Sequence, residues 1–401
     1  FIAKFEDFHD QAEWLKVIWH HLYSTASARD KGTLYAARNV LDARNVSDDP
    51  HSNFYAASEF ADKVLNAYLI VGAMNHHGMH SLDGEPTVNN YDGLLNDPEG
   101  KKQHVYTVIR SFVEQHVINQ VPEMSTSAPI SNDLTCRFCK RKYVQAPALR
   151  KHEEKKHGFK PTAIEMADKI QSGGPDKVHN YTHQVLILLL LRLNHNNAIS
   201  LGDGGRIIRL YKFFCLYFKV SNCPKYAIAT LQLLAQVNCL LSPCLAYSLT
   251  WNRFVNNQGH VDTNFPMDLS VEHDNKAFKN DIHSFRGEIT DKSIARVSKS
   301  VEPTNTILAS YDKTTCVKTP SGKHLLKSTE EDILLLVDHL QHSEIYAQIP
   351  GRKHSAFPNM PHNLLGEIEP EKLKEWISTR LKKFSKKHFY QFGKTVSNTV
   401  N

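Results

Sequence analysis

Long apolar stretches are missing from this chain of 401 residues. The longest, residues 185–191, is too short to cross a bilayer. The first residues also lack a charged leader and a cleavage-site pattern, so the sequence predicts no signal peptide and no membrane partner. Because the chain begins at Phe1 instead of Met, we expect it to be a fragment of a longer protein. We find no internal repeats.

Cysteine is scarce, and its count of seven is odd. Two of the seven belong to a motif described below. The other five stand singly in apolar surroundings, which predicts reduced core residues of an intracellular protein instead of a disulfide framework. These five are Cys215, Cys223, Cys239, Cys244 and Cys316.

Net charge is small outside one short segment. The whole chain carries 48 Lys and Arg against 42 Asp and Glu, a formal net charge of +6. Residues 136–157 alone hold eight basic and two acidic residues, which is also +6, so the remainder is balanced. Such a basic segment permits contact with nucleic acid without demonstrating it. The eight are Arg137, Lys140, Arg141, Lys142, Arg150, Lys151, Lys155 and Lys156.

The same segment has the ligand spacing of a C2H2 zinc finger. Cys136 and Cys139 are separated by two residues, twelve residues follow, and His152 and His157 are separated by four. Tyr143 and Leu149 occupy the two apolar core positions that are expected of a small ββα fold. A segment of this length buries too little apolar surface to fold alone, and Zn²⁺ supplies the missing free energy. The spacing therefore predicts a structural Zn²⁺ site with these four ligands.

The sequence indicates less directly what the finger binds. Counting back from His152 places Gln145, Ala148 and Lys151 at the base-reading positions of DNA-binding fingers. One finger covers only about three base pairs, too few for a specific site. We therefore expect nucleic-acid contact through these residues and through Arg141, Lys142 and Arg150. The alternative is an architectural or protein-binding zinc clamp.

Apolar periodicity predicts a mainly α fold with the finger embedded in it. The expected units are an N-terminal helical region with a leading strand at residues 1–5 (1–121), linker and finger (122–162), a helical core (175–316) and a C-terminal helical unit (328–392). The last unit ends in basic residues, namely Lys382, Lys383, Lys386 and Lys387. The expected helices span residues 14–23, 53–74, 105–118, 178–193, 205–220, 226–241, 244–254, 268–285, 293–311 (interrupted by Pro303), 329–347 and 371–389.

A second candidate site involves two acids far apart in the chain. Glu272, with His273 and Asn275, lies near the start of a predicted helix, and Asp7 follows the predicted leading strand. A carboxylate at a strand end and another on a distant helix can hold Mg²⁺ for phosphoryl transfer. The alternative is that Asp268 caps its helix while Glu272 and His273 lie on a solvated face.

Several blocks of the sequence are distinctive when taken together. They are Asp7-Phe8-His9, the helix at 14–23, residues 30–35 with Arg38-Asn39, Gly202-Asp203-Gly204, residues 206–212, residues 251–254 and residues 272–275. This combination resembles an uncharacterised eukaryotic family of transposon-derived, DDE-transposase-like proteins that carry a C2H2 finger. The resemblance covers about residues 1–316, and residues 251–275 are its most specific part.

The resemblance implies a ribonuclease-H-like core, or its remnant, with a large helical insertion that contains the zinc site. It also implies that Asp7 and Glu272 match the second and third acids of a DDE triad. The first acid of such a triad lies on an earlier strand, and we therefore expect no strand transfer by this fragment.

Three hypotheses follow from these observations. The favoured one is a nuclear, transposon-derived zinc-finger protein that contacts nucleic acid. The second is the C-terminal part of a Mg²⁺-dependent transposase. The third is a helical interaction protein, with a protein partner, in which the zinc is purely structural.

Overall fold

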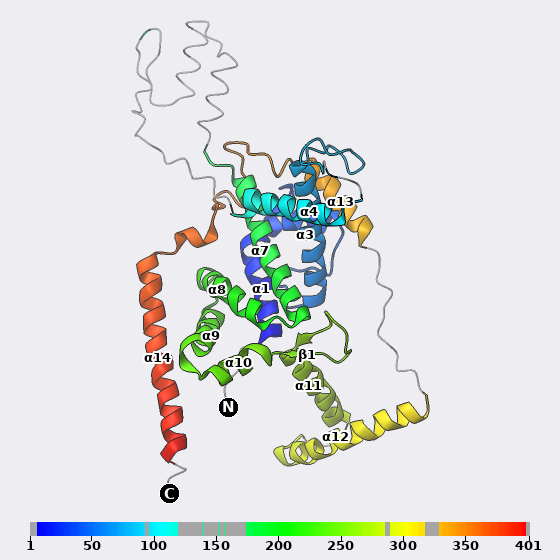
Figure 1. Cartoon of the computed structure of the whole chain (residues 1–401), viewed down its shortest axis with the longest axis vertical. Helices are drawn as coiled ribbons and strands as arrows, with labels where there is room; N and C mark the ends of the chain where they lie inside the picture. Colours follow the sequence, from blue (N-terminus) through cyan, green and yellow to red (C-terminus); the bar gives the residue numbers. More distant parts are fainter. Residues whose placement is uncertain are drawn as a thin grey trace.

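The computed structural model describes residues 6–91, 93, 96–118, 139, 152, 156, 174–284, 289–316 and 329–397, with side chains only up to residue 384 in the last range. This part of the chain is mainly helical, as predicted (Figure 1). Its β-structure is a short antiparallel pair, β1 (Phe254–Val255) and β2 (Phe265–Pro266), in which Phe254 pairs with Pro266. The predicted strand at residues 1–5 lies outside the described residues.

The helices fall into two groups along the chain. Before the predicted finger they are α1 (Asp7–Leu22), η1 (Thr25–Ser27), α2 (Leu34–Val40), α3 (Phe54–His76), α4 (Pro98–Val113) and η2 (Glu114–Ile118). After it they are α7 (Lys177–Leu201), α8 (Gly204–Val220), α9 (Pro224–Ala235), η3 (Gln236–Leu240), α10 (Pro243–Trp251), α11 (Met267–Ser284), α12 (Asp291–Thr314), α13 (Glu330–Gln341), η4 (Leu364–Glu367) and α14 (Pro370–Ser397).

The apolar face of α1 is the centre of the core. Trp14 is fully buried, stacks on Phe214 of α8 with ring centroids 4.0 Å apart, and donates its indole N–H to the Leu188 carbonyl at 3.2 Å. The same core includes Leu336 of α13. Residues from the three expected helical units at 1–121, 175–316 and 328–392 thus share one apolar core. In Figure 1, α1, α3 and α7 run through the middle of this body.

The Gly202-Asp203-Gly204 block forms the corner between α7 and α8. Gly202 ends α7 with φ of +70°, a left-handed conformation that glycine adopts without strain. The Asp203 side chain then caps α8 by accepting from the Arg206 N–H at 2.9 Å. A Cβ at Gly204 would lie 2.1 Å from the Thr250 carbonyl oxygen, so α10 approaches too closely for any side chain there.

Helices α4 and α12 differ from the expected helices, the first because of capping. Helix α4 begins at Pro98, where the Asp97 side chain accepts from the Gly100 N–H, and not at residue 105. Helix α12 runs continuously through Pro303, which was expected to interrupt it.

The expectation for the five single cysteines is only partly correct. All five are free, and Cys215 is buried. Cys239, Cys244 and Cys316 are exposed, so their placement in the core was wrong. Short apolar runs do not specify which face of a helix is covered, and all three lie at or beyond helix ends.

Candidate functional site

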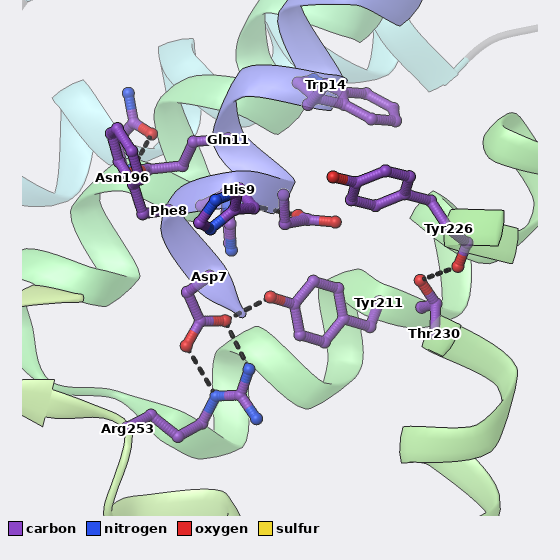
Figure 2. Close-up of polar contacts among 12 residues, drawn as sticks. Asp7, Phe8, His9, Gln11, Trp14, Asn196, Tyr211, Tyr226, Thr230 and Arg253 are labelled. Carbon is purple, nitrogen blue, oxygen red and sulfur yellow. Dashed lines mark hydrogen bonds and ion pairs between the residues drawn. The ribbon is translucent and has the colours of Figure 1, made fainter. Parts of the chain in front are cut away.

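A buried ion pair holds the first residue of α1. Arg253 donates from Nε to Oδ2 of Asp7 at 2.8 Å and from Nη2 to Oδ1 at 2.5 Å. The Tyr211 hydroxyl donates to the same Oδ1 (Figure 2). All three side chains are almost completely buried. Both oxygens of the Asp7 carboxylate are therefore already engaged.

The three partners come from distant elements. Asp7 begins α1, Tyr211 lies on α8, and Arg253 lies between α10 and β1. Burial raises the pKa of the Tyr211 phenol, and the nearby Asp7 charge raises it further. Burial works against the charged form of Arg253, but the contacts with Asp7 and Tyr211 together outweigh it, and the pKa of the guanidinium is raised. The phenol therefore stays a hydrogen-bond donor and the guanidinium stays a cation.

Two more titratable groups, Asp10 and His195, lie close to this ion pair. Asp10 is fully buried, and neither of its carboxylate oxygens is hydrogen-bonded within the described part of the chain. His195 Nδ1 is 4.0 Å from Asp10 Oδ2, which is beyond hydrogen-bonding distance. Burial, with the neighbouring Asp7 charge, raises the pKa of Asp10 well above its usual value. Burial lowers the pKa of His195 to about 4, so this imidazole is neutral at pH 7.

The start of α1 is capped by a residue 260 positions away in the chain. Glu6, at the N-cap position, makes no side-chain capping bond. Asp268 of α11 supplies it instead, accepting from the N–H groups of Phe8 at 2.9 Å and His9 at 3.2 Å. A carboxylate here satisfies free N–H groups and interacts favourably with the helix dipole. Asp268 thereby fixes α11 against α1.

The same corner contains the group of described residues that could hold a metal ion. His9 Nδ1 lies 3.1 Å from Asp268 Oδ2 and 3.1 Å from Glu6 Oε2. One ligand atom from each of the three lies within 4.8 Å of the others. Imidazole and carboxylate are ligands for divalent transition metals, but the same geometry also suits a hydrogen-bonded His–carboxylate pair.

The two acids predicted to be catalytic have different surroundings. Asp7 is held by Arg253 and Tyr211, whereas Glu272 is exposed on α11, one turn beyond Asp268. The carboxylate of α11 that contacts α1 is thus Asp268. It caps α1 and not its own helix, contrary to the alternative considered from the sequence, while Glu272 and His273 do lie on an exposed face. The pairing of Asp7 with Glu272 stays a prediction.

Sequence reasoning missed Asp268, Tyr211 and Arg253 as partners of α1. Tyr211 and Arg253 are part of the blocks that carried the family resemblance, which was the available signal. Nothing local marks them as a pair with Asp7, because they lie 204 and 246 residues away from it.

Two of the four predicted zinc ligands are described. Cys139 Sγ and His152 Nε2 lie 3.1 Å apart, although 13 positions separate them in the chain. The other predicted ligands, Cys136 and His157, lie outside the described residues. So do the predicted nucleic-acid contacts Gln145, Ala148, Lys151, Arg141, Lys142 and Arg150.

The described part thus defines a helical protein in which a buried ion pair joins α1, α8 and the loop before β1. Residues 1–324 match DUF6589, a family of unknown function, and the chain belongs to that family. No curated protein and no solved structure shows significant similarity to the chain. Among the described helices, none is both long and apolar enough to span a membrane.

Proposed function

We propose that this protein is a zinc-binding C2H2 finger protein of transposon-derived type that contacts nucleic acid through the finger. The observation that carries the proposal is the 3.1 Å approach of Cys139 Sγ and His152 Nε2 within a segment of C2H2 spacing. With Zn–S and Zn–N bonds of about 2.3 and 2.0 Å, one ion can reach both atoms. Cys136 and His157 would complete a closed, structural tetrahedron.

Charge supports nucleic acid as the partner. Residues 136–157 concentrate a net charge of +6 within 22 positions, which attracts a polyanion to the finger. Arg141, Lys142 and Arg150 would contact phosphates, and Gln145, Ala148 and Lys151 would face base edges. Because one finger reads about three base pairs, we propose contact of low sequence specificity. A nuclear location follows from this partner and is part of the proposal.

Metal analysis of the purified full chain tests the zinc site. We expect about one Zn²⁺ per chain, from one C2H2 unit. Cys136→Ser should lower the bound zinc strongly. Cys239→Ser, which changes an exposed cysteine outside the motif, should leave it unchanged. Unchanged zinc in Cys136→Ser would show that the ligand set is wrong.

Salt dependence of binding to a labelled duplex tests the nucleic-acid contact. Each phosphate contact contributes about −0.9 to the slope of log K against log salt concentration. Arg141→Ala with Lys142→Ala should make that slope less steep by up to about two such contributions. Lys292→Ala with Lys299→Ala, which removes two exposed charges from α12, is the matched control. A wild-type slope near zero, with zinc still bound, would favour the helical interaction protein with a structural zinc site.

A second candidate is the C-terminal part of a Mg²⁺-dependent transposase that lacks its first catalytic acid, and one corner of the structure favours it. Helix α11, which carries Glu272, is fixed against α1 through Asp268, and Glu6, His9 and Asp268 form a possible cation group. Calorimetric titration with Mg²⁺ tests it. A DDE site requires that Asp7→Asn and Glu272→Gln each weaken Mg²⁺ binding. If Mg²⁺ binding is lost in Asp268→Asn alone, the ion lies at the α1 cap. If the wild-type chain binds no Mg²⁺, this candidate is wrong.

A further inference from the structure

Acidic residues are missing from a long described stretch of the helical body. Residues 204–261 contain no Asp or Glu, although 42 of the 401 residues of the chain are acidic. An even distribution would place about six acids there, so the absence gives this stretch a positive charge of its own. Its cations are Arg206, Arg209, Lys212, Lys219, Lys225 and Arg253.

Two of these cations are available at the surface of α8. Arg253 is buried against Asp7, Arg206 lies 3.3 Å from Asp203, and Lys219 lies over the Trp376 ring. Arg209 and Lys212, one turn apart on α8, are exposed, and no acid of the described residues pairs with either of them.

Large aromatic side chains lie on the same side of the molecule. Tyr247 of α10 is 68% exposed, Phe213 of α8 is 51% exposed, and Trp251 at the end of α10 is 41% exposed. The rings of Tyr247 and Trp251 are 6.1 Å apart. A Cβ at Gly205 would lie 3.6 Å from Arg209 Nη1 and 3.9 Å from Trp251 Cζ2. The two helices therefore form one continuous surface.

We call this surface the α8–α10 face and define it by Arg209, Lys212, Phe213, Tyr247 and Trp251. Helices α8 and α10 lie together at one end of the body (Figure 1). Its cations and lack of acids fit a polyanion. Its exposed rings fit flat, unpaired bases, which stack on aromatic side chains, whereas a duplex hides the faces of its bases.

We propose that the α8–α10 face binds single-stranded nucleic acid, with Arg209 and Lys212 on phosphates and the three rings against bases. None of the five residues that define this face belongs to the predicted finger. An anionic membrane would also be attracted by the charge, and Tyr and Trp suit its interface, so vesicle binding is one outcome of the test.

The test measures anisotropy of a labelled 20-nucleotide oligo-dT with the full-length chain, in the wild type and in the Cys136→Ser background. We expect Tyr247→Ala to weaken binding about tenfold with an unchanged salt slope, because stacking is not ionic. Arg209→Glu with Lys212→Glu should weaken binding at least tenfold and make the salt slope less steep. Both effects should persist in the Cys136→Ser background, which distinguishes this face from the finger.

Two control variants make matching changes elsewhere on the surface. Tyr55→Ala removes a tyrosine on α3 that is 66% exposed, and Lys292→Glu with Lys299→Glu reverses two exposed charges on α12. Neither should change oligo-dT affinity. Circular dichroism melting of each variant shows whether it is folded, and Lys212→Gln replaces the double reversal if that variant unfolds. Unchanged affinity in Tyr247→Ala overturns the proposal, as does equal loss on the matching duplex. Variant-sensitive binding to phosphatidylserine vesicles without oligo-dT binding overturns it too.

Discussion

The predicted finger and the start of α1 bring their polar side chains together by opposite routes. In the finger, four ligands within 22 positions are expected to converge because one ion binds them all. At α1, Tyr211, Arg253 and Asp268 reach the start of the helix from more than 200 positions along the chain, because the apolar core has already packed their helices. The first arrangement can be recognised in a sequence and the second cannot.

Loss of the zinc should produce the largest difference in stability between the finger and the helical body. We expect Cys139→Ser to cost the finger the zinc-binding free energy, roughly 10–16 kcal/mol in finger peptides, and to unfold residues 136–157. The helical body should keep its melting temperature, because its described core contains no residue of that segment. Limited proteolysis followed by mass spectrometry would locate the new cuts, and calorimetry would follow the body. A parallel fall in the melting temperature of the body would show that the finger and the body do not fold independently.

Loss of the buried cation should damage the body instead. Arg253→Met leaves the Asp7 carboxylate buried without its charge partner, which typically costs about 3–5 kcal/mol. Urea unfolding monitored by tryptophan fluorescence measures the loss, because Trp14 lies in the same core. The double variant Asp7→Leu/Arg253→Met should lose less than the single variant, since no unpaired charge remains.

The control for this change is Arg110→Met on α4. The Arg110 side chain is 81% exposed and pairs with Glu114 at 2.9 Å. We expect no measurable change, because exposed ion pairs contribute little. A cost below about 1 kcal/mol for Arg253→Met would mean that water relieves the buried charge.

These two regions also show how far the sequence could be used for prediction. Helical periodicity located α3, α8 and α11, because apolar spacing records which face of a helix is buried. Helix α1 begins at Asp7, seven residues before the expected start at residue 14. Asp7 was singled out only as a carboxylate expected to pair with Glu272, and that pairing stays a prediction. Its observed partners were not predicted, because an ion pair across 246 positions leaves no local pattern. Trp251 and Asn252, beside Arg253, could be identified only as part of a family block, with no indication of where they pack.

Acidification should affect the body through His195. Because burial lowers its pKa from 6.5 to about 4, the folded protein binds fewer protons than the unfolded chain between these values. Stability is therefore fully present above pH 6.5 and is lost as the pH falls towards 4, by at most roughly 3 kcal/mol at 1.36 kcal/mol per pKa unit. His195→Gln cannot take up the proton and should lose less stability over this range. Urea unfolding of both proteins at pH 7.0, 5.5 and 4.5 tests this, and parallel losses would contradict it.

The smallest expected effect is the difference in stability cost between replacing Asp268 and replacing Glu272, two acids on α11. Asp268→Ala removes the cap of α1 and should cost about 1 kcal/mol, the usual cost of a lost N-cap. Glu272→Ala, one turn along α11 and exposed, should stay within about 0.5 kcal/mol. Asp268→Asn should fall between wild type and Asp268→Ala, because an amide oxygen still accepts from the Phe8 and His9 N–H groups without the charge that favours the helix dipole. Equal costs for Asp268→Ala and Glu272→Ala in urea unfolding would mean that α1 does not depend on α11 for its cap.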